Sequence, residues 1–412
     1  MRRFANVIDD ERKSILLLGG SRQQVVAIEA AKRLGYRTVL CDYLPDNPGQ
    51  YAADVFYLES TTDYKRMLEI ARAERVSGVL AYASDPAAMT AAYVSERLGL
   101  PGNPMSAVET LSEKHRFRAH LAAIGLPCPK AAPISIDISP EEVMALAEDM
   151  RLPVVLKPTD SSGSKGVSIL DDLGNEKISA ALAHAKSFSR NGTLVLEEFI
   201  RSSFPRVIGG DIFVVDGEVR FWGLMSCLRD EGLGGLVPIG ERSPSGLDSR
   251  QLSRVRELIQ KLISSLGVRC GELNVEVIMG KDDTPYLLEL GARAGGNMIP
   301  VQLSDISGID LVEANVRAAM GDESLDVSFD GSDESFATYV LHSCVDGVFH
   351  GVELSPEIAG HVYRRVMYVE PGDSMCVFDG ANKALGILFL RFDDVAQMEA
   401  LLSRIQTMIT VF

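Results

Sequence analysis

A predicted hairpin at residues 271–297 constrains the fold more than any other stretch of the chain. Two apolar runs, Asn274–Met279 and Tyr286–Leu290, flank a polar turn, Gly-Lys-Asp-Asp-Thr-Pro, a pattern typical of a β-hairpin with a short loop. A turn centred between the two aspartates places Glu276 directly opposite Glu289. Both side chains then leave the same face of the hairpin, about 5 Å apart at Cβ.

Two facing carboxylates inside apolar strands repel each other, so one should stay protonated unless a cation lies between them. A hard divalent ion such as Mg²⁺ supplies that cation and usually brings substrate phosphates with it. Arg293 follows Glu289 by four residues and precedes Gly295-Gly296, whose bare backbone amides can approach an anion. The alternative is a surface hairpin with two solvated glutamates.

The composition limits the class of protein. A chain of 412 residues is long enough for two or three domains, and 46% hydrophobic with 24% charged residues excludes a disordered chain. No apolar run approaches the roughly 18 residues that span a bilayer. The net charge of −16 argues against nucleic acid as a partner, because a duplex needs a basic face. Six scattered cysteines and a polar N-terminus favour a cytoplasmic protein with reduced thiols.

Residues 15–112 alternate short apolar strands with helical stretches, which predicts a doubly wound parallel sheet. Gly19-Gly20-Ser21, at the first strand-to-helix turn, can hold an anion at a helix N-terminus. The glycine spacing of a dinucleotide site is missing there, which argues against a nicotinamide cofactor. Asp42 and Asp85 follow strand ends where open α/β sheets bind ligands, but each is also a candidate helix cap. For Asp85, before a proline, the cap is the preferred interpretation.

A second block carries lysines and a glycine-rich loop. A polar helix is expected to begin at Ser112, and the prolines after Gly125 indicate an extended crossing and a domain boundary. A strand then ends in Lys157 and runs into the loop 159–167, whose amides and hydroxyls can close over phosphates. The loop lacks the Gly-Lys-Ser/Thr ending of a P-loop, so it predicts another kind of ATP site. An ordinary flexible turn is the alternative.

The remaining chain continues as strands and helices. Leu194–Ile200 is predicted as a strand with two acids among apolar residues. A long loop at Asp230–Ser249 is expected to be functional, because loops of this length are uncommon inside compact domains. Residues 336–412 form a smaller last unit without a recognisable motif.

Taken in order, these features resemble the ATP-grasp superfamily of ligases over about residues 14–325. The shared features are a leading α/β domain, Lys114, Lys157, the loop 160–166, Glu197–Ile200, Glu276, Glu289 and Arg293. The resemblance implies an α/β fold of the ATP-grasp type in three parts. These are a doubly wound parallel-sheet domain at 1–112, an ATP-grasp domain with an antiparallel nucleotide-binding sheet at 113–325, whose lid spans about 127–200, and a small C-terminal subdomain at 326–412.

The resemblance also implies several kinds of site residue. Phosphate contacts would come from Lys114 and Lys157, under a lid loop formed by Ser161, Ser162, Gly163, Ser164 and Gly166. The adenine edge would be read by the hinge Glu197, Glu198, Phe199 and Ile200, and the ribose would be held by an acid there or by Asp211. Glu276 and Glu289 would ligate Mg²⁺, with Mn²⁺ as an alternative. Arg293 would bind the transferring phosphoryl group or the acyl phosphate, and Arg293 and Lys157 would be the catalytic residues.

One position departs from the family pattern. Many members end the metal strand with Glu-x-Asn-x-Arg, where the asparagine completes the metal shell, but this chain has Gly291 at that place. Water or a substrate oxygen would have to take the coordination position. The departure puts a two-metal geometry in doubt without removing the two glutamates.

The implied reaction is activation of a carboxylate as an acyl phosphate, with ADP released, followed by attack of an amine. The sequence resembles L-amino-acid ligases and purine-pathway synthetases more than biotin carboxylase. Its expected partners are therefore a small carboxylate and an amine, with amino acids as candidates, rather than nucleic acid or membrane, and a homodimer is left open. Two alternatives also stay open, namely a bicarbonate-activating carboxylase and a non-catalytic ATP-binding regulatory protein.

Overall fold

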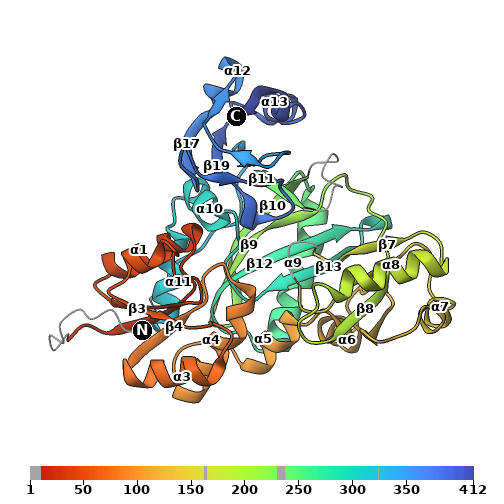
Figure 1. The fold of residues 1–412 in the computed structure, drawn as a ribbon, viewed down its shortest axis with the longest axis horizontal. Helices are drawn as coiled ribbons and strands as arrows, with labels where there is room; N and C mark the ends of the chain where they lie inside the picture. Colours follow the sequence, from red (N-terminus) through yellow and green to blue (C-terminus); the bar gives the residue numbers. More distant parts are fainter. Residues whose placement is uncertain (1–10, 162–164, 230–236, 323) are drawn as a thin grey trace.

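The computed structural model describes residues 11–161, 165–229, 237–322 and 324–412, and three larger sheets organise them (Figure 1). One is parallel and N-terminal, one is a small antiparallel sheet, and the largest is an antiparallel sheet of eight strands. In these described ranges no helix is both long and apolar enough to cross a membrane. The predicted class, α/β with a parallel domain and antiparallel sheets, is confirmed.

The N-terminal sheet is parallel, as the alternation of strands and helices predicts. Its strands lie in the order β3-β2-β1-β4 and all neighbouring pairs run parallel. Apolar clusters cover both faces, one under α3 and α4 and the other under α1 and the later helix α11 (Leu311–Ala319). The bounds are β1 (Ser14–Leu18), α1 (Val25–Arg33), β2 (Arg37–Asp42), α2 (Gly49–Ala52), β3 (Val55–Leu58), α3 (Tyr64–Ala73), β4 (Val76–Leu80) and α4 (Asp85–Leu98).

Two helices lead from this domain to the small antiparallel sheet. Ser112 ends the first helix, and Glu113 is extended, so the helix expected to begin at Ser112 begins at Lys114 instead. The sheet has the order β5-β8-β6-β7, and an apolar cluster packs it against α7 and α8. The bounds are α5 (Met105–Ser112), α6 (Lys114–Ala123), β5 (Ala131–Ser135), α7 (Pro140–Ala147), β6 (Val154–Pro158), β7 (Ser168–Leu170), α8 (Asn175–Lys186) and β8 (Thr193–Glu198).

The eight-stranded sheet has the order β13-β12-β9-β10-β11-β14-β19-β17. Helix α9 covers one face, and α10 and α11 pack on the other. Strand β11 lies inside the long loop predicted at Asp230–Ser249, so that prediction was wrong for this part. Glu241 and Arg242 are buried in β11 and break the apolar pattern that would have revealed a strand. The bounds are β9 (Ile208–Val215), β10 (Glu218–Arg229), β11 (Pro238–Ser243), α9 (Ser249–Leu266), β12 (Gly271–Met279), β13 (Pro285–Gly291) and α10 (Ile299–Ser307).

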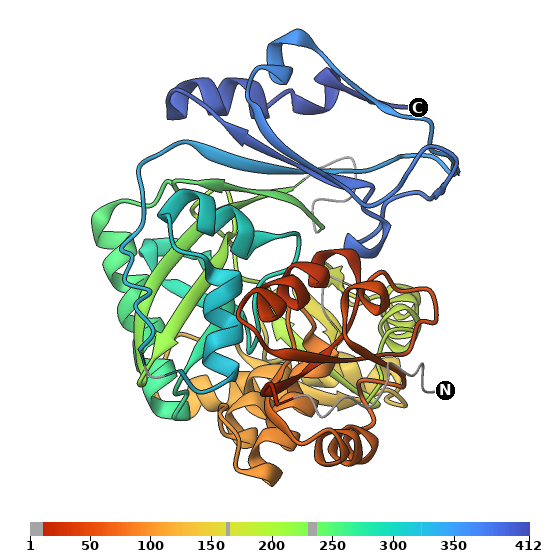
Figure 2. The same cartoon turned by 90° about the vertical axis from the view of Figure 1, so that its left-hand side faces the viewer.

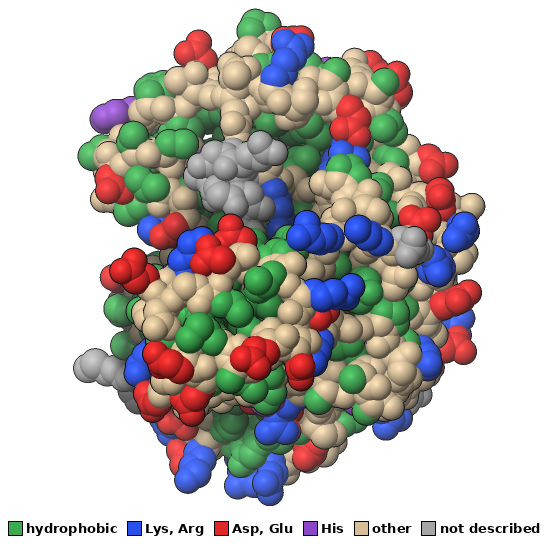
Figure 3. Space-filling view, turned by 90° about the vertical axis from the view of Figure 1, so that its right-hand side faces the viewer, with side chains coloured by type: hydrophobic (Ala, Val, Ile, Leu, Met, Phe, Trp, Pro, Cys, Tyr) green, Lys and Arg blue, Asp and Glu red, His purple; other side chains and the backbone are tan. Residues whose placement is uncertain are grey.

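The C-terminal unit extends this sheet and contacts the N-terminal domain (Figure 2). Val26 of α1 packs against Ile387 and Phe389 of β19, which brings the first and last parts of the chain together. Acidic and basic side chains are interspersed on the face seen in Figure 3. The bounds are β14 (Phe336–Leu341), β15 (Gly347–Val348), β16 (Val352–Leu354), α12 (Pro356–Ala359), β17 (Val362–Met367), β18 (Ser374–Met375), β19 (Gly386–Arg391), α13 (Val395–Leu402) and β20 (Ile409–Val411).

Candidate active site

Glu276 and Glu289 are direct partners across β12 and β13, as the sequence predicts. The route to this register differs from the expected one. Between the turn and the Val277–Leu287 pair, the strands are shifted by one residue from the predicted register. Leu288 is an extra residue in β13 that forms a β-bulge, and this bulge restores the pairing of the two glutamates. Without the bulge, Leu288 would stand opposite Glu276, because a one-residue slip moves side chains to the other face.

The two glutamates form an electrostatically strained pair. Burial and the neighbouring Glu289 carboxylate raise the pKa of Glu276 above its usual value. Each carboxylate has one cation beside it: Lys114 Nζ lies 3.2 Å from Glu289 Oε1, and Arg229 Nη2 lies 3.8 Å from Glu276 Oε2. Among the described residues no group of three or more His, Cys, Asp or Glu side chains could hold a metal. A divalent ion would therefore take two protein carboxylates and fill its shell with phosphate oxygens or water, an arrangement that Mg²⁺ favours.

Lys157, the predicted phosphate lysine, belongs to a buried charge network that the sequence did not reveal. Its ammonium group donates to Glu197, and Arg118 Nε donates to the other Glu197 oxygen at 2.9 Å. Burial lowers the pKa of Lys157. Burial alone would raise the pKa of Glu197, but Arg118 and Lys157 lower it to about 2. The Glu197 carboxylate is therefore already engaged, which argues against the predicted use of this acid to hold a ribose.

Arg118 also supports the bulge in β13. Its guanidinium donates to the carbonyl oxygens of Leu287 and Leu288, at 3.3 and 3.0 Å. A bulge leaves backbone groups outside the regular ladder, and buried carbonyls need partners. Arg118 stands one helical turn after Lys114 in the polar helix, and that spacing is the one signal from which its role could have been found.

The glycine-rich loop is described at its two ends only. Lys114 donates to the Ser161 carbonyl, and Ser161 Oγ donates to the carbonyl of Lys165 at 2.9 Å. Gly166 has φ +73°, a left-handed conformation that favours glycine. Lys114 thus joins the start of the loop to Glu289. The predicted lid residues Ser162, Gly163 and Ser164 lie outside the described residues.

The predicted hinge lines a cavity. Glu198, Phe199 and Ile200 border a space of about 430 Å³, which Tyr286 of β13 closes from the other side. The Phe199 amide donates to the Pro153 carbonyl at 3.0 Å. The Arg151 amide and guanidinium both donate to the Glu198 carboxylate. Glu197 points away from this cavity into the buried network.

Asp211 is fully buried and does not line the hinge cavity. Its carboxylate accepts hydrogen bonds from the Gly295 amide at 2.7 Å and from Asn274 Nδ2 at 2.8 Å. Burial raises its pKa, and the carboxyl of Glu272 lies next to it. These contacts support a role in holding the loop after β13, and they argue against the predicted ribose contact.

Arg293 is held by Asp85 of the N-terminal domain. Its Nε and Nη2 each lie 2.7 Å from a different oxygen of the Asp85 carboxylate. Ser84, not Asp85, is the N-cap residue of α4, so the preferred cap interpretation was wrong. Burial would lower the pKa of Arg293, but the Asp85 carboxylate raises it. Any Cβ at Gly291 would lie 3.3 Å from both Asp85 Oδ1 and Arg293 Cζ, so the ion pair would have to shift by a few tenths of an ångström to admit the asparagine of the expected pattern.

The first strand-to-helix turn offers its amides to side chains of the protein itself. The Gly20 amide donates to Asp42 Oδ2 at 2.7 Å, and the Ser21 amide donates to Gln24 Oε1 at 2.8 Å. Asp42 also accepts from the Leu44 amide. An anion at this turn would have to displace these contacts, so the structure gives no support to an anion site there.

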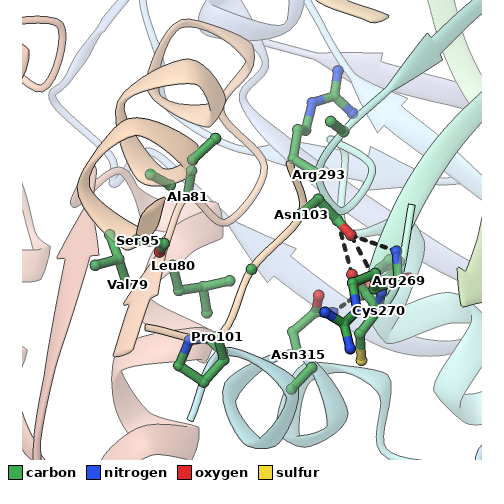
Figure 4. Close-up of a pocket in the computed structure, with 18 of the residues that line it drawn as sticks. Val79, Leu80, Ala81, Ser95, Pro101, Asn103, Arg269, Cys270, Arg293 and Asn315 are labelled. Carbon is green, nitrogen blue, oxygen red and sulfur yellow. Dashed lines mark hydrogen bonds between the residues drawn. The ribbon is translucent and has the colours of Figure 1, made fainter. Parts of the chain in front are cut away.

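Two more cavities border the Arg293–Asp85 pair. One of about 320 Å³ is bordered by Asp85, Ser161 and Glu289. The other, about 480 Å³, lies between the N-terminal domain and the large sheet, with Arg293 on its wall and Asn103 bonded to the backbone of Arg269 and Cys270 (Figure 4). The site therefore has space on both sides of the Arg293–Asp85 pair.

Comparison with known proteins decides the family. The model described as "Carbamoyl-phosphate synthase L chain, ATP binding domain" matches residues 113–327, just over half of the chain. The chain belongs to this family. The carbamoyl phosphate synthase large chain of Corynebacterium glutamicum is 25% identical over 341 residues, 78% of this chain and 30% of that protein. The chain thus spans less than a third of the length of this relative.

Solved structures of low sequence identity share the fold. An L-amino acid ligase from Bacillus licheniformis has a TM-score of 0.80 at 18% identity, covering 97% of this chain and 98% of that one. The biotin carboxylase domain of the Hydrogenobacter thermophilus 2-oxoglutarate carboxylase, solved with MgADP, ADP and bicarbonate, has a TM-score of 0.75 at 18% identity, covering 96% and 90%. The ATP-grasp fold expected from the sequence is therefore confirmed.

Proposed function

We propose that this protein is an ADP-forming ligase that couples a small carboxylate to an amine. The observation that carries the proposal is the facing pair Glu276 and Glu289 with Lys114 and Arg293 beside it. Two carboxylates and several cations around one space are the groups that phosphoryl transfer requires, because this reaction depends on positioning and charge neutralisation. Membership in a family described as an ATP-binding domain supports the same reading.

In the proposed reaction an oxygen of the substrate carboxylate attacks the γ-phosphorus of ATP, and the bond to the ADP oxygen breaks. The amine nitrogen then attacks the acyl carbon, the bond to the phosphate oxygen breaks, and the nitrogen loses a proton. The products are an amide, ADP and phosphate. An acyl phosphate is already a good electrophile, so the protein has mainly to hold the two reactants together and exclude water.

The proposed roles follow the contacts. Glu276 and Glu289 would hold Mg²⁺ or Mn²⁺, which neutralises charge on the phosphates when bound. Lys114 would give up its hydrogen bond to the Ser161 carbonyl and donate to a phosphate. Lys157 would donate to a phosphate while it keeps its contact with Glu197. Arg293 keeps N–H groups on Nη1 and Nη2 beyond those given to Asp85 and Ala294, and these would bind the phosphoryl group being transferred.

The hinge cavity would take the base. A space of about 430 Å³ bordered by Glu198, Phe199 and Ile200 accommodates a flat ring, and backbone groups at the hinge would read its edge. Phe199 is partly exposed, which suits a residue that contacts a ligand. The lid loop expected from the sequence, Ser161 to Gly166, would cover the phosphates.

Two alternatives lead to different experiments. A bicarbonate-activating carboxylase is favoured by the fold match to a biotin carboxylase domain solved with bicarbonate. Incorporation of labelled bicarbonate into product would establish that alternative. A non-catalytic ATP-binding protein would bind nucleotide without releasing ADP under any substrate pair.

We place the protein in the cytoplasm with small-molecule partners. The six cysteines are all free thiols in the structure, which suits a reducing compartment. A homodimer is compatible with the proposal and would be checked by light scattering.

The function is tested by ADP release over a panel of carboxylates and amines offered singly and in pairs. The proposal expects ADP release that needs both partners, with an amide identified by mass spectrometry. ADP release that needs bicarbonate, or none with any pair, would reject the carboxylate–amine ligase.

A further inference from the structure

A row of side chains crosses the large sheet on the face of the acid pair. Glu276 precedes Val277, and Val277 pairs with Ile208, so Gly209 on β9 faces the same side as Glu276. Cys227 of β10 and Glu241 of β11 are partners, and both lie over Gly209. The row therefore runs from β13 to β11 and continues beyond the predicted metal site.

The Glu241 carboxyl leans along this row toward the acid pair. A Cβ placed on Gly209 would lie 3.0 Å from Glu241 Oε2 and 2.7 Å from Cys227 Sγ. Glu241 starts on β11, and β10 separates β11 from β9. The Glu241 side chain thus extends over β10, and its carboxyl lies above β9. Strand β9 is one strand spacing, about 5 Å, from β12, which carries Glu276.

This row contains an orphaned acceptor and an orphaned donor. Glu241 Oε2 and Arg229 Nε are both buried, and neither has a hydrogen-bond partner among the residues that the structure describes. An unpaired buried polar group costs free energy, more so if charged, and such a group needs an explanation. Burial raises the pKa of Glu241 to about 8, a state that a bound cation would reverse.

A second metal does not explain the orphaned carboxyl. Among the described residues Glu241 joins no cluster of three acids, cysteines or histidines that could hold an ion. The backbone around it is already fixed, because Thr338 Oγ1 accepts from the Glu241 amide and Gln302 Nε2 donates to its carbonyl. The Glu241 side chain has the Cys227 thiol in hydrogen-bonding contact, whereas its Oε2 has no hydrogen-bond partner among the described residues.

We propose that Glu241 and Arg229 form a subsite for a zwitterionic α-amino acid, with its ammonium group on Glu241 and its carboxylate on Arg229. The proposal rests on the proposed ligase function and names the chemical class of one substrate. The Arg229 guanidinium lies near enough to Glu241 to lower the pKa of its carboxyl, so one small ligand that carries both a donor and an acceptor can reach both orphaned atoms. Its position about one strand spacing from Glu276 brings it beside the reacting phosphates.

The test measures binding of the twenty proteinogenic L-amino acids to the full chain by calorimetry, with and without a non-hydrolysable ATP analogue and Mg²⁺. For an amino acid that binds, Glu241→Gln and Arg229→Gln should each raise Kd by about 10- to 100-fold, the range for hydrogen bonds to charged groups. For Glu241→Gln, affinity for the ATP analogue should change less than about threefold. Arg229 lies beside the Glu276 carboxylate, so its variant is judged by the ligand analogues below and not by nucleotide affinity. The control is Glu399→Gln, which removes a carboxylate paired with Arg242 on the opposite face of β11.

Ligand analogues separate a contact from a structural role. Glu241→Gln should not weaken binding of the des-amino acid, and Arg229→Gln should not weaken binding of the amino acid amide, because each ligand lacks the group that the variant has lost. Equal losses for all ligands would overturn the proposal. So would the absence of binding of any amino acid to the wild-type chain.

A hydroxylamine trap shows which substrate occupies the subsite. If the bound amino acid alone gives ADP and a hydroxamate in the presence of hydroxylamine, it is the acid that becomes activated. If it accelerates ADP release only with a second acid present, it is the nucleophile. Amino acid binding without ADP release would reject the ligase and keep the subsite, whereas ADP release with substrates that bind independently of Glu241 and Arg229 would do the reverse.

Discussion

Glu276 and Glu289 face each other across β12 and β13 because β13 contains one extra residue, Leu288, between the hairpin turn and Glu289. Arg118 holds the two carbonyl groups at this bulge and also bonds to Glu197, the partner of Lys157. One buried arginine thus connects the strand of the proposed metal-binding acid Glu289 to Lys157, the proposed phosphate-binding lysine. Placement of both groups relative to each other depends on this connection.

Neutralising one of the facing acids should abolish activity without destabilising the fold. Glu289→Gln or Glu276→Gln is expected to lower the rate of ADP release by at least about 100-fold, the order expected for loss of a group that stabilises the phosphoryl transition state. The melting temperature of the ligand-free protein should stay the same or rise, because the repulsion within the pair is relieved. Scanning fluorimetry beside the ADP assay checks both, and a near-normal rate would reject the metal role.

Loss of the buried lysine should separate catalysis from stability. Lys157→Ala is expected to lower turnover by about 100-fold or more. Glu197 keeps Arg118 as a partner, so the loss of stability should be smaller than that caused by removing Arg118. Urea unfolding of both variants gives the comparison, and a more damaging Lys157→Ala would contradict the described network.

Arg118→Leu should cost about 3–5 kcal/mol of unfolding free energy, because it leaves Glu197 in a buried site with one cation and the Leu287 and Leu288 carbonyls without their donor. Arg118→Lys keeps the charge but not the planar fork, so it should recover stability only in part. Urea titration measures both. Arg116→Leu, on the same helix but exposed and paired with Glu113, is the control and should change stability little.

Glu241 predicts a specific pH dependence of stability. Its folded pKa of about 8 lies above the ordinary 4.5, so the folded state keeps a proton that the unfolded chain releases. The contribution is fully present below pH 4.5 and is lost as pH rises toward 8. Relative to Glu241→Gln, the wild-type chain should therefore lose at least about 1.4 kcal/mol between pH 5 and 8, the equivalent of one pKa unit. A pH-independent difference between the two would show that this carboxyl is not desolvated.

The parts of the fold that follow from local pattern were predictable. The βαβ rhythm gave the parallel sheet, and the apolar runs around a polar turn gave the hairpin and its Glu276–Glu289 pair. The pair was nevertheless predicted from a symmetric turn, whereas the protein combines a shifted turn with a bulge. Bulges depend on tertiary contacts, here with Arg118, and periodicity does not reveal them.

Contacts between residues far apart in the sequence could not be predicted. Strand β11 was hidden because Glu241 and Arg242 are charged yet buried between β10 and β14. The family resemblance puts Glu197 in the hinge with Glu198, but successive residues of a strand point to opposite faces, and the Glu197 carboxylate lies in the buried network with Arg118 and Lys157. The proline after Asp85 favours a helix cap, and no sequence signal could place Arg293, more than 200 residues away, against Asp85.

Glu276 and Glu289 are proposed to hold the nucleotide through a divalent ion, and the proposed function depends on this contact. Its most direct test is calorimetric binding of a non-hydrolysable ATP analogue, with and without Mg²⁺, to the wild-type protein and to the double variant Glu276→Gln/Glu289→Gln. The account predicts that Mg²⁺ strengthens binding to the wild-type protein by at least about tenfold and has little effect on the double variant. An equal effect of Mg²⁺ on both proteins, or nucleotide binding that needs neither acid nor metal, would contradict it.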